Sequence, residues 1–387
     1  MRRTRRALFL VTPLVTAVSL LGGPLPALAD APRPPDVAGL QSALTDLVQQ
    51  PGGPPGAIVT LGRAGHLDVL TAGAADLATG RPPAAGDAMR VASVAKAFNA
   101  ATALSLVSRG DLSLDETVGG RRPDLPHEWW PVTLRQLLGH TSGIPDFSRG
   151  DAFVAALLGS LLDPPPPRRL LSYVDEPALL FPPGTEYRYS NSDNVVAGLM
   201  IEAATGRSYA DVLESQVLRP AGLTATSLPV GADLPAPYVH GYDVSEQPPE
   251  DVSAAIAAGW AWASGGVVST PADLARFIGE DVRGAFTDRR TRHEQFDFRP
   301  GSSEPPGPGR NSAGLGLFRY ETRCGTVYGH TGNTAGYTQF AAATGDGRRT
   351  VTVSVNGQIT PSGAPELFEQ VRAVYEMATC AAVARHR

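Results

Sequence analysis

One lysine stands alone among the basic residues of this chain. The 387 residues include 33 lysines and arginines, and Lys96 is the only lysine. A guanidinium keeps its proton at any accessible pH, whereas an ammonium group can lose its proton when its surroundings lower its pKa. A solitary lysine in a chain that otherwise uses arginine therefore indicates a position that requires a group able to become neutral. We interpret Lys96 as a candidate general base.

Ser93 precedes this lysine by three positions. Residues 94–107 predict a helix that stops at Gly110, and its only charge is Lys96, so we expect it in the core. Because residues three apart share a helix face, the Lys96 amine can reach the Ser93 hydroxyl. Burial lowers the pKa of a lysine, and a hydroxyl beside such a base is typical of an activated nucleophile. The alternative is that Ser93 only caps the helix.

Two further motifs come later in the chain. A Tyr-Ser-Asn sequence begins at Tyr189, in a turn-rich stretch before an apolar helix predicted from about 195 to 204. A His-Thr-Gly sequence begins at His330, after a short β-type run at 326–328. Ser-x-x-Lys is itself a known signature of penicillin-interacting serine enzymes.

The order of these three motifs resembles that of the serine β-lactamase and penicillin-binding DD-peptidase superfamily. Within it, the chain resembles the class C-type branch and most of all its secreted D-alanyl-D-alanine carboxypeptidases. The resemblance extends over nearly the whole chain after residue 29, including residues 137–146, 260–261 and 314–317.

The resemblance implies a hydrolase that works through an acyl-enzyme. Ser93 would attack the carbonyl carbon of an amide or ester, and Lys96 and Tyr189 would share the proton transfers. His330 would add polarity near the base. The backbone N–H groups of Ser93 and Asn333 would stabilise the oxyanion, an effect typically worth a few kcal/mol per donor.

The resemblance also implies which residues contact the substrate. Asn191 would hold an amide group of the substrate, and Thr331 and Gly332 would line the strand along which the substrate lies. Trp260 would form an apolar wall, and Phe153 would line the same pocket.

Structural roles stay open as alternatives for several of these residues. Tyr189 and Trp260 could be core aromatics, and Asn191 could be a turn or cap residue. His330 could likewise be structural. We interpret His140, in the Gly-His-Thr-Ser-Gly sequence, as structural, because a metal role would lack partner ligands.

Two positions depart from the carboxypeptidase pattern. Enzymes of that kind hold the free carboxylate of the substrate with an arginine directly after Gly-Leu-Gly-Leu and with a hydroxyl two residues after the motif threonine. Phe318 and Asn333 occupy these positions here. Neighbouring strand residues face opposite sides, so Arg319 could substitute only if a bulge turned it inward. Phe318 would favour an apolar leaving group.

Three functions therefore remain open. The first is a penicillin-sensitive D-alanyl-D-alanine carboxypeptidase that acts on peptidoglycan-type peptides. The second is an esterase, β-lactamase or D-aminopeptidase of the same family. The third is a penicillin-binding or sensing protein that is acylated without turnover, although the intact set of Ser93, Lys96, Tyr189 and His330 argues against it.

The elements that must position these residues are predicted to form an α/β (α+β) fold. The resemblance implies an antiparallel sheet flanked by helices, with an α/β domain at residues 30–110 and 255–387 and a mostly helical domain at 111–254. Residues 300–309, rich in proline and glycine, are predicted to be a loop with no catalytic role. Besides the helices at 94–107 and about 195–204, the sequence predicts helices at 37–49 and 365–382. The predicted strands are 57–61, 67–72, 315–320, 326–328, 337–343 and 350–355.

The first 29 residues are typical of a secretory signal peptide. Four arginines precede an apolar stretch, which leads to a small-residue cleavage site that ends at Ala29. The apolar stretch is short and interrupted by prolines, so we expect no stable membrane anchor. The protein is predicted to be secreted, by the general or the twin-arginine route.

Composition narrows the classes of partner. The net charge of −5 becomes −9 once the four arginines of residues 1–29 are removed. Because the remaining chain is acidic and has no basic cluster, we do not expect nucleic acid as a binding partner. We expect a monomer that binds a small peptide, ester or β-lactam and needs no cofactor or metal. Cys324 and Cys380, the only cysteines, predict a disulfide in an exported chain.

Overall fold

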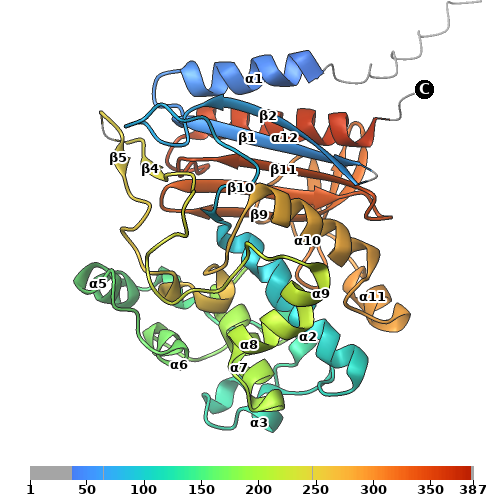
Figure 1. Cartoon of the computed structure of the whole chain (residues 1–387). Coiled ribbons are helices and arrows are strands. Elements are labelled where there is room, and N and C mark those ends of the chain that lie inside the picture. The colour runs from blue at the N-terminus through green and yellow to red at the C-terminus, as the bar shows by residue number, and fades with distance from the viewer. Residues whose placement is uncertain (1–36, 64, 246, 385–387) are drawn as a thin grey trace, which may run out of the picture. The chain divides into compact units, whose positions relative to one another are not determined.

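A seven-stranded antiparallel sheet forms the centre of the computed structural model, which describes residues 37–63, 65–245 and 247–384 (Figure 1). Its strand order is β2-β1-β11-β10-β9-β8-β7, so strands from the two ends of the chain lie side by side. The predicted antiparallel sheet flanked by helices is confirmed. The strands are β1 Gly56–Arg63, β2 His66–Gly73, β7 Arg310–Ala313, β8 Phe318–Thr322, β9 Gly325–Thr334, β10 Tyr337–Ala343 and β11 Arg349–Val355.

Strand β10 shows how the sheet is covered on both faces. All seven of its residues are buried, and successive side chains point to opposite faces. Phe340 joins an apolar core with α1 (Val37–Gln49) and α12 (Pro365–Val383). Ala341 joins the other core, which includes residues of α10 (Pro271–Arg283) and α2 (Ala95–Arg109). The helix that carries Lys96 therefore lies beneath the sheet, within the larger core.

The region between the two parts of the sheet is mostly helical. Helix α7 (Asn191–Thr205) packs against α2, and both are almost entirely buried in their first three turns. The remaining helices are α3 Val118–Arg121, α4 Leu134–Leu138, α5 Asp151–Gly159, α6 Pro167–Leu170, α8 Tyr209–Leu213, α9 Arg219–Ala221 and α11 Arg289–Gln295, and the short strands are β3 Met89–Arg90, β4 Tyr242–Asp243, β5 Glu250–Asp251 and β6 Val268–Ser269.

The predicted elements differ from the observed ones mainly near the site. Helix α1 and strand β10 have the predicted limits, whereas β9 extends from the predicted 326–328 to Thr334. Gly329 and Gly332 lower the strand propensity of this stretch, so the sequence pattern stops too early. Strand β8 begins three residues later than predicted, because Gly316 turns the chain with a left-handed φ of 72°.

Cys324 and Cys380 form the predicted disulfide, with their Cα atoms 5.1 Å apart. It joins the turn between β8 and β9 to helix α12. Residues 37–384 belong to one compact unit, and the predicted boundaries at 110 and 254 remain a prediction. The predicted signal peptide lies outside the described residues. Among the described helices, none has both the length and the apolar character that a membrane crossing requires.

Candidate active site

Ser93 and Lys96 meet at the start of helix α2. Ser93 lies in a 3-10 turn, Ala92–Val94, that runs directly into the helix, so it is not the capping residue. Ala92 has a left-handed φ of 51°, a strained conformation for a residue with a side chain and one that is common at functional sites. The Lys96 Nζ atom lies 3.0 Å from Ser93 Oγ. The predicted contact between amine and hydroxyl is therefore present.

The Lys96 amine is completely buried and has three oxygen neighbours. Besides Ser93 Oγ, it donates to Asn191 Oδ1 at 2.8 Å and to the Ser264 carbonyl at 2.6 Å. These last two oxygens can only accept hydrogen bonds, so they use both N–H groups of a neutral amine. The nitrogen lone pair of that neutral amine then faces the Ser93 hydroxyl, as a general base requires.

Burial controls the protonation of this amine. Loss of solvation lowers the pKa of Lys96 from 10.5 to about 7, and a negative charge on Asp146 or Asp193 opposes that shift by attracting the ammonium form. A substantial fraction of Lys96 is therefore neutral at neutral pH. Lysine, unlike arginine, can supply a base in this position.

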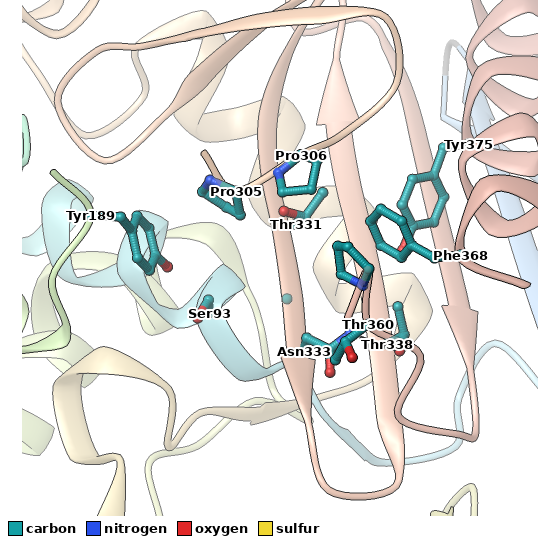
Figure 2. Close-up of a pocket in the computed structure, with 12 residues that line it drawn as sticks. Ser93, Tyr189, Pro305, Pro306, Thr331, Asn333, Thr338, Thr360, Phe368 and Tyr375 are labelled. Carbon is teal, nitrogen blue, oxygen red and sulfur yellow. Dashed lines mark hydrogen bonds between the residues drawn. The ribbon is translucent and has the colours of Figure 1, made fainter. Parts of the chain in front are cut away.

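Tyr189 lies against the other side of the amine. The Lys96 Nζ atom is 4.9 Å from the centre of the Tyr189 ring, and Figure 2 shows the phenol oxygen turned toward Ser93. Burial raises the pKa of Tyr189 well above 10, an effect that the nearby Ser93 hydroxyl only partly offsets. A phenol in this state remains protonated, so Lys96 is better suited than Tyr189 to accept the first proton.

Asn191 connects this centre to a buried acid. Its Oδ1 accepts from Lys96, and its Nδ2 donates to Asp146 Oδ2 at 3.1 Å and to Ser148 Oγ at 2.9 Å. Both N–H groups of the amide are thus used within the protein. The predicted contact between Asn191 and a substrate amide is limited to the remaining lone pair of Oδ1.

Strand β9 approaches the nucleophile very closely at Gly332. A Cβ atom there would lie 2.4 Å from the Val91 carbonyl oxygen and 3.1 Å from the Ser93 backbone nitrogen. Glycine therefore lets the strand lie beside the nucleophile. The neighbouring Asn333 is anchored by its side chain, which donates to the Ile359 carbonyl at 2.6 Å. The backbone of β9 is close enough to Ser93 for the predicted oxyanion hole, which remains a prediction.

A cavity of about 210 Å³ opens beside Ser93 and Tyr189 (Figure 2). Its lining contains no charged side chain. Pro305 and Pro306, from the predicted loop 300–309, contribute to its lining, and the absence of a catalytic role for this loop stays a prediction. The lining residues are Ser93, Tyr189, Pro305, Pro306, Thr331, Gly332, Asn333, Thr338, Thr360, Pro361, Phe368 and Tyr375.

Similarity to known proteins agrees with this geometry. The family model described as Beta-lactamase matches residues 44–376, which is most of the chain. This chain belongs to the β-lactamase family. The family match confirms the predicted resemblance.

Relatives within the family carry several activities in their names. "Penicillin-binding protein 4*" of Bacillus subtilis is 31% identical over 159 residues, which cover 40% of this chain and 33% of that protein. "Esterase EstB" of Burkholderia gladioli is 34% identical over 180 residues, covering 43% and 45%. These matches span less than half the length of either relative. A solved D-stereospecific amidohydrolase from Streptomyces sp. is 30% identical with a TM-score of 0.76, covering 87% of this chain and 98% of that one.

In this β-lactamase-family chain, one of the two positions that depart from the carboxypeptidase pattern, Asn333, lines the cavity, and the other, Phe318, does not. Phe318 is 2% exposed and packs edge-to-face on His330, with ring centres 5.1 Å apart. Arg319 pairs with Tyr328 in a regular register, so no bulge turns it inward. Its guanidinium lies over the Phe298 ring at 5.5 Å instead. The prediction that Phe318 and Arg319 contact the substrate is corrected.

His330 is buried behind Tyr189 rather than exposed in the cavity. Its ring centre is 6.3 Å from that of Tyr189, and burial lowers its pKa to about 3. It is therefore neutral, and the polarity that it adds comes from an uncharged imidazole. Thr331, the next residue, does line the cavity, as predicted.

Phe153 and Trp260 come together in a second cavity of about 160 Å³. Their ring centres are 5.7 Å apart, in edge-to-face contact. This cavity is bordered by Gly265, which follows the Ser264 carbonyl bound by Lys96, and by Thr334, which follows Asn333. The two aromatic residues line this second cavity and not the one beside Ser93, so their contact with the substrate stays a prediction.

Sequence reasoning missed several contributors. Asp146 ends the 137–146 segment, and Ser264 precedes the Gly-Gly pair at 265–266, yet neither was assigned a role. A carbonyl oxygen leaves no signal in the residue type, and the approach of Phe368 from α12 depends on the packing of the whole sheet. Within the described residues, no three His, Cys, Asp or Glu side chains gather in a way that could hold a metal ion.

Proposed function

We propose that this chain is a serine hydrolase that forms an acyl-enzyme and cleaves amides, or short peptides, of D-amino acids with a neutral leaving group. The observation that carries the proposal is the uncharged lining of the cavity beside Ser93. A free carboxylate bound there would lack a cation, and burying an unpaired charge is costly. The D configuration is supported by the name of the similar amidohydrolase.

The proposed first step acylates the serine. Neutral Lys96 accepts the Ser93 proton while Oγ forms a bond to the substrate carbonyl carbon. The carbonyl oxygen becomes an oxyanion, which the N–H groups of Ser93 and Asn333 would stabilise. The proton held by Lys96 then passes by way of the Tyr189 hydroxyl to the leaving nitrogen, and the C–N bond breaks.

The second step removes the acyl group. Water takes the place of the leaving amine, and Lys96, neutral again, accepts its proton as the water oxygen bonds to the acyl carbon. The C–O bond to Ser93 breaks, the proton returns to Oγ, and the acid is released. Because Tyr189 stays protonated, it acts as a proton relay and not as a phenolate base.

A D-alanyl-D-alanine carboxypeptidase is the second candidate. It is supported by the order of the three motifs and by the similarity to a penicillin-binding protein. It requires recognition of the terminal carboxylate by neutral donors alone, for which Thr331 and Thr360 are available in the cavity.

A comparison of three substrates tests the proposal. We expect the purified chain to release ammonia from D-alanine amide faster than from L-alanine amide, and D-alanine from diacetyl-Lys-D-Ala-D-Ala at least about tenfold more slowly. The Ser93→Ala variant is the control and should lose both turnover and labelling by a fluorescent penicillin. Faster release of D-alanine would select the carboxypeptidase. Labelling without turnover of any substrate would select a binding or sensing protein.

We also propose that the protein is exported and that residues 1–29 are removed. The basic start, the apolar stretch and the small residues before Asp30 support this proposal. Mass spectrometry of the protein from culture supernatant should find Asp30 as the first residue. A cell-associated chain that retains residues 1–29 would contradict it.

A further inference from the structure

Behind the catalytic residues lies a second buried pair, His140 and Asp193. Their side chains are 4% and 0% exposed, and His140 Nδ1 lies 2.9 Å from Asp193 Oδ2. The other carboxyl oxygen of Asp193 accepts a hydrogen bond from the Ser142 hydroxyl. Among the described residues, His140 is the only basic residue within ion-pair distance of Asp193.

This pair contacts the Tyr-Ser-Asn turn from its inner side. The His140 ring centre is 4.5 Å from the Tyr189 ring centre, and the Ser190 backbone N–H donates to His140 Nδ1 at 3.4 Å. Asp193 lies in the first turn of α7, two residues after Asn191. Any movement of the pair would therefore be transmitted to Tyr189 and Asn191.

Hydrogen-bond accounting locates the proton between the two side chains. The Ser190 backbone N–H can only donate, and its contact with Nδ1 of His140 at 3.4 Å favours the form in which this nitrogen carries a lone pair, shared with Asp193, and no hydrogen. In that form the proton between Nδ1 and Asp193 belongs to the carboxyl group. Ser142 completes the network, since its hydroxyl donates to Asp193 and accepts from the Ile144 N–H.

We propose that His140 and Asp193 form an uncharged pair, with the shared proton on the Asp193 carboxyl, that positions Tyr189 and allows Lys96 to become neutral. The proposal rests on the proposed function only for the role of Lys96 as base. His140 and Asp193 are positioning residues, because neither lines the cavity beside Ser93.

Electrostatics favours the uncharged form of both partners, the Asp193 carboxyl group and the His140 imidazole. Burial raises the pKa of Asp193 well above its usual range and lowers that of His140 well below its own. The phenols of Tyr187 and Tyr189 lie against the pair, and three further titratable groups act on it from other elements. Asp146 adds to the rise for Asp193, Lys96 opposes it, and Lys96 and His330 both add to the fall for His140. Once Lys96 loses its proton, its opposition disappears.

The uncharged pair matters for Lys96 because an ionised Asp193 would hold the proton on the amine. Asp146 and Asp193 can both attract the ammonium charge. If Asp193 is protonated, only the Asp146 charge opposes the loss of the Lys96 proton. Asp146 and Asp193 therefore differ in charge, although both lie near the Lys96 amine.

Infrared spectroscopy tests the location of the proton without requiring turnover. The spectrum of the full chain near pH 7 should contain a protonated-carboxyl C=O band that is absent from Asp193→Asn. Ser142→Ala should shift this band, because it removes the hydrogen bond to the same carboxyl group, and it offers a second measurement if Asp193→Asn does not fold. A carboxyl region that neither variant changes would overturn the proposal. Because the inactive Ser93→Ala protein should show the same band, failure of the proposed function would not obscure the result.

A pair of matched substitutions tests the consequence for catalysis. In the pH dependence of kcat/KM, Asp146→Asn should move the acid limb to lower pH by about half a unit or more, because an ionised neighbour of Lys96 is lost. Asp193→Asn should leave the limb in place, whatever its effect on kcat, because one neutral group replaces another. An equal shift in both variants would show that Asp193 is ionised and would overturn the proposal.

The positioning role has its own test. His140→Asn keeps an acceptor for the Ser190 N–H and suits the left-handed φ of 54° at this position. His140→Leu removes the acceptor. We expect His140→Leu to lower kcat at least tenfold more than His140→Asn, with KM changed by less than about threefold in both. Equal losses in the two variants would contradict the role of Nδ1.

Discussion

At the scale of single residues, the site depends on the surroundings of one amine. Two acceptor-only oxygens, from Asn191 and Ser264, use the N–H groups of Lys96 and leave its lone pair for Ser93. Burial then brings the lysine pKa to about 7, where both protonation states are populated. Geometry and electrostatics thus act together. Burial of the amine without these acceptors would only cost free energy, because its N–H groups would lack hydrogen-bond partners.

Activity should rise with pH as Lys96 loses its proton. The pKa is lowered to about 7, so the rate should increase about tenfold per pH unit below 7 and level off above it. Lys96→Arg should abolish this profile and lower kcat/KM by at least about a thousandfold, because arginine keeps its proton. Arg109→Lys, at the exposed end of the same helix, is the matched control and should behave as wild type. A Lys96→Arg protein with wild-type activity would show that Lys96 supplies only charge.

Residue types alone predicted Ser93 and Lys96, because the rarity of lysine and its spacing from serine are visible in the sequence. Residue types could not predict that the Asn191 side-chain amide donates a hydrogen bond to Asp146. Nor could they predict that the Phe318 ring packs against His330. Those outcomes depend on which side of a strand or turn faces the site, and the sequence pattern leaves that choice open.

At the scale of elements, the site forms where strand β9 meets the turn before α2. The short β-type run at 326–328 predicted the existence of β9 but ended it at 328, before the part that approaches Ser93. Glycine weakens a strand pattern at the very positions where a close approach requires it. The part of the strand that matters most for function was for this reason the hardest to predict.

Gly332→Ala should disrupt this approach. The added methyl group would lie 2.4 Å from the Val91 carbonyl oxygen, so either β9 or the turn at 91–93 must move. We expect a loss of at least about a hundredfold in kcat/KM and of roughly 1–3 kcal/mol in the free energy of unfolding, the usual effect of overpacking. Gly86→Ala, where a Cβ meets no atom within 4 Å, is the control. Kinetics and urea unfolding that are alike for both variants would show that the close approach is unimportant.

At the scale of the whole molecule, the ends of the chain stabilise the sheet that carries the site. Strands β1 and β11 pair along seven residues, so a strand near the start of the described chain is held by one near its end. Helices α1 and α12 cover the same face of the sheet and contact each other. Changes in α12 should therefore affect the sheet and, through Phe368 and Tyr375, the cavity beside Ser93.

The disulfide should add stability to this arrangement. It connects positions 56 residues apart, and closing a loop of that size removes roughly 4 kcal/mol of conformational entropy from the unfolded chain. Replacing both cysteines with serine should lower the melting temperature by several degrees, with kcat/KM changed by less than about threefold because neither cysteine lines the cavity. Thermal unfolding of the wild-type protein with and without reductant is an independent check. An unchanged melting temperature would show that the bond constrains little.

One buried carboxyl group should make the stability of the molecule depend on pH. Asp281, on α10 beneath the sheet, is 1% exposed, and burial raises its pKa from 3.8 to about 7. Between these values the unfolded chain has lost the proton while the folded chain keeps it, so stability should fall as pH rises from about 4 to 7. A difference of about three pKa units corresponds to roughly 4 kcal/mol. Above pH 7 this contribution should stay constant.

Asp281→Asn should remove that fall, because an amide near Gln295 needs no proton to remain neutral. We expect the variant to match the wild-type protein near pH 4 and to exceed its stability at pH 8 by up to roughly 4 kcal/mol, as measured by urea unfolding. Asp46→Asn, on the exposed side of α1, is the control and should change neither value by more than about half a kcal/mol. If Asp281→Asn were equally destabilising at both pH values, the carboxylate would be ionised and stabilising in the folded protein. The interface between α10 and the sheet would then accommodate the buried negative charge of Asp281.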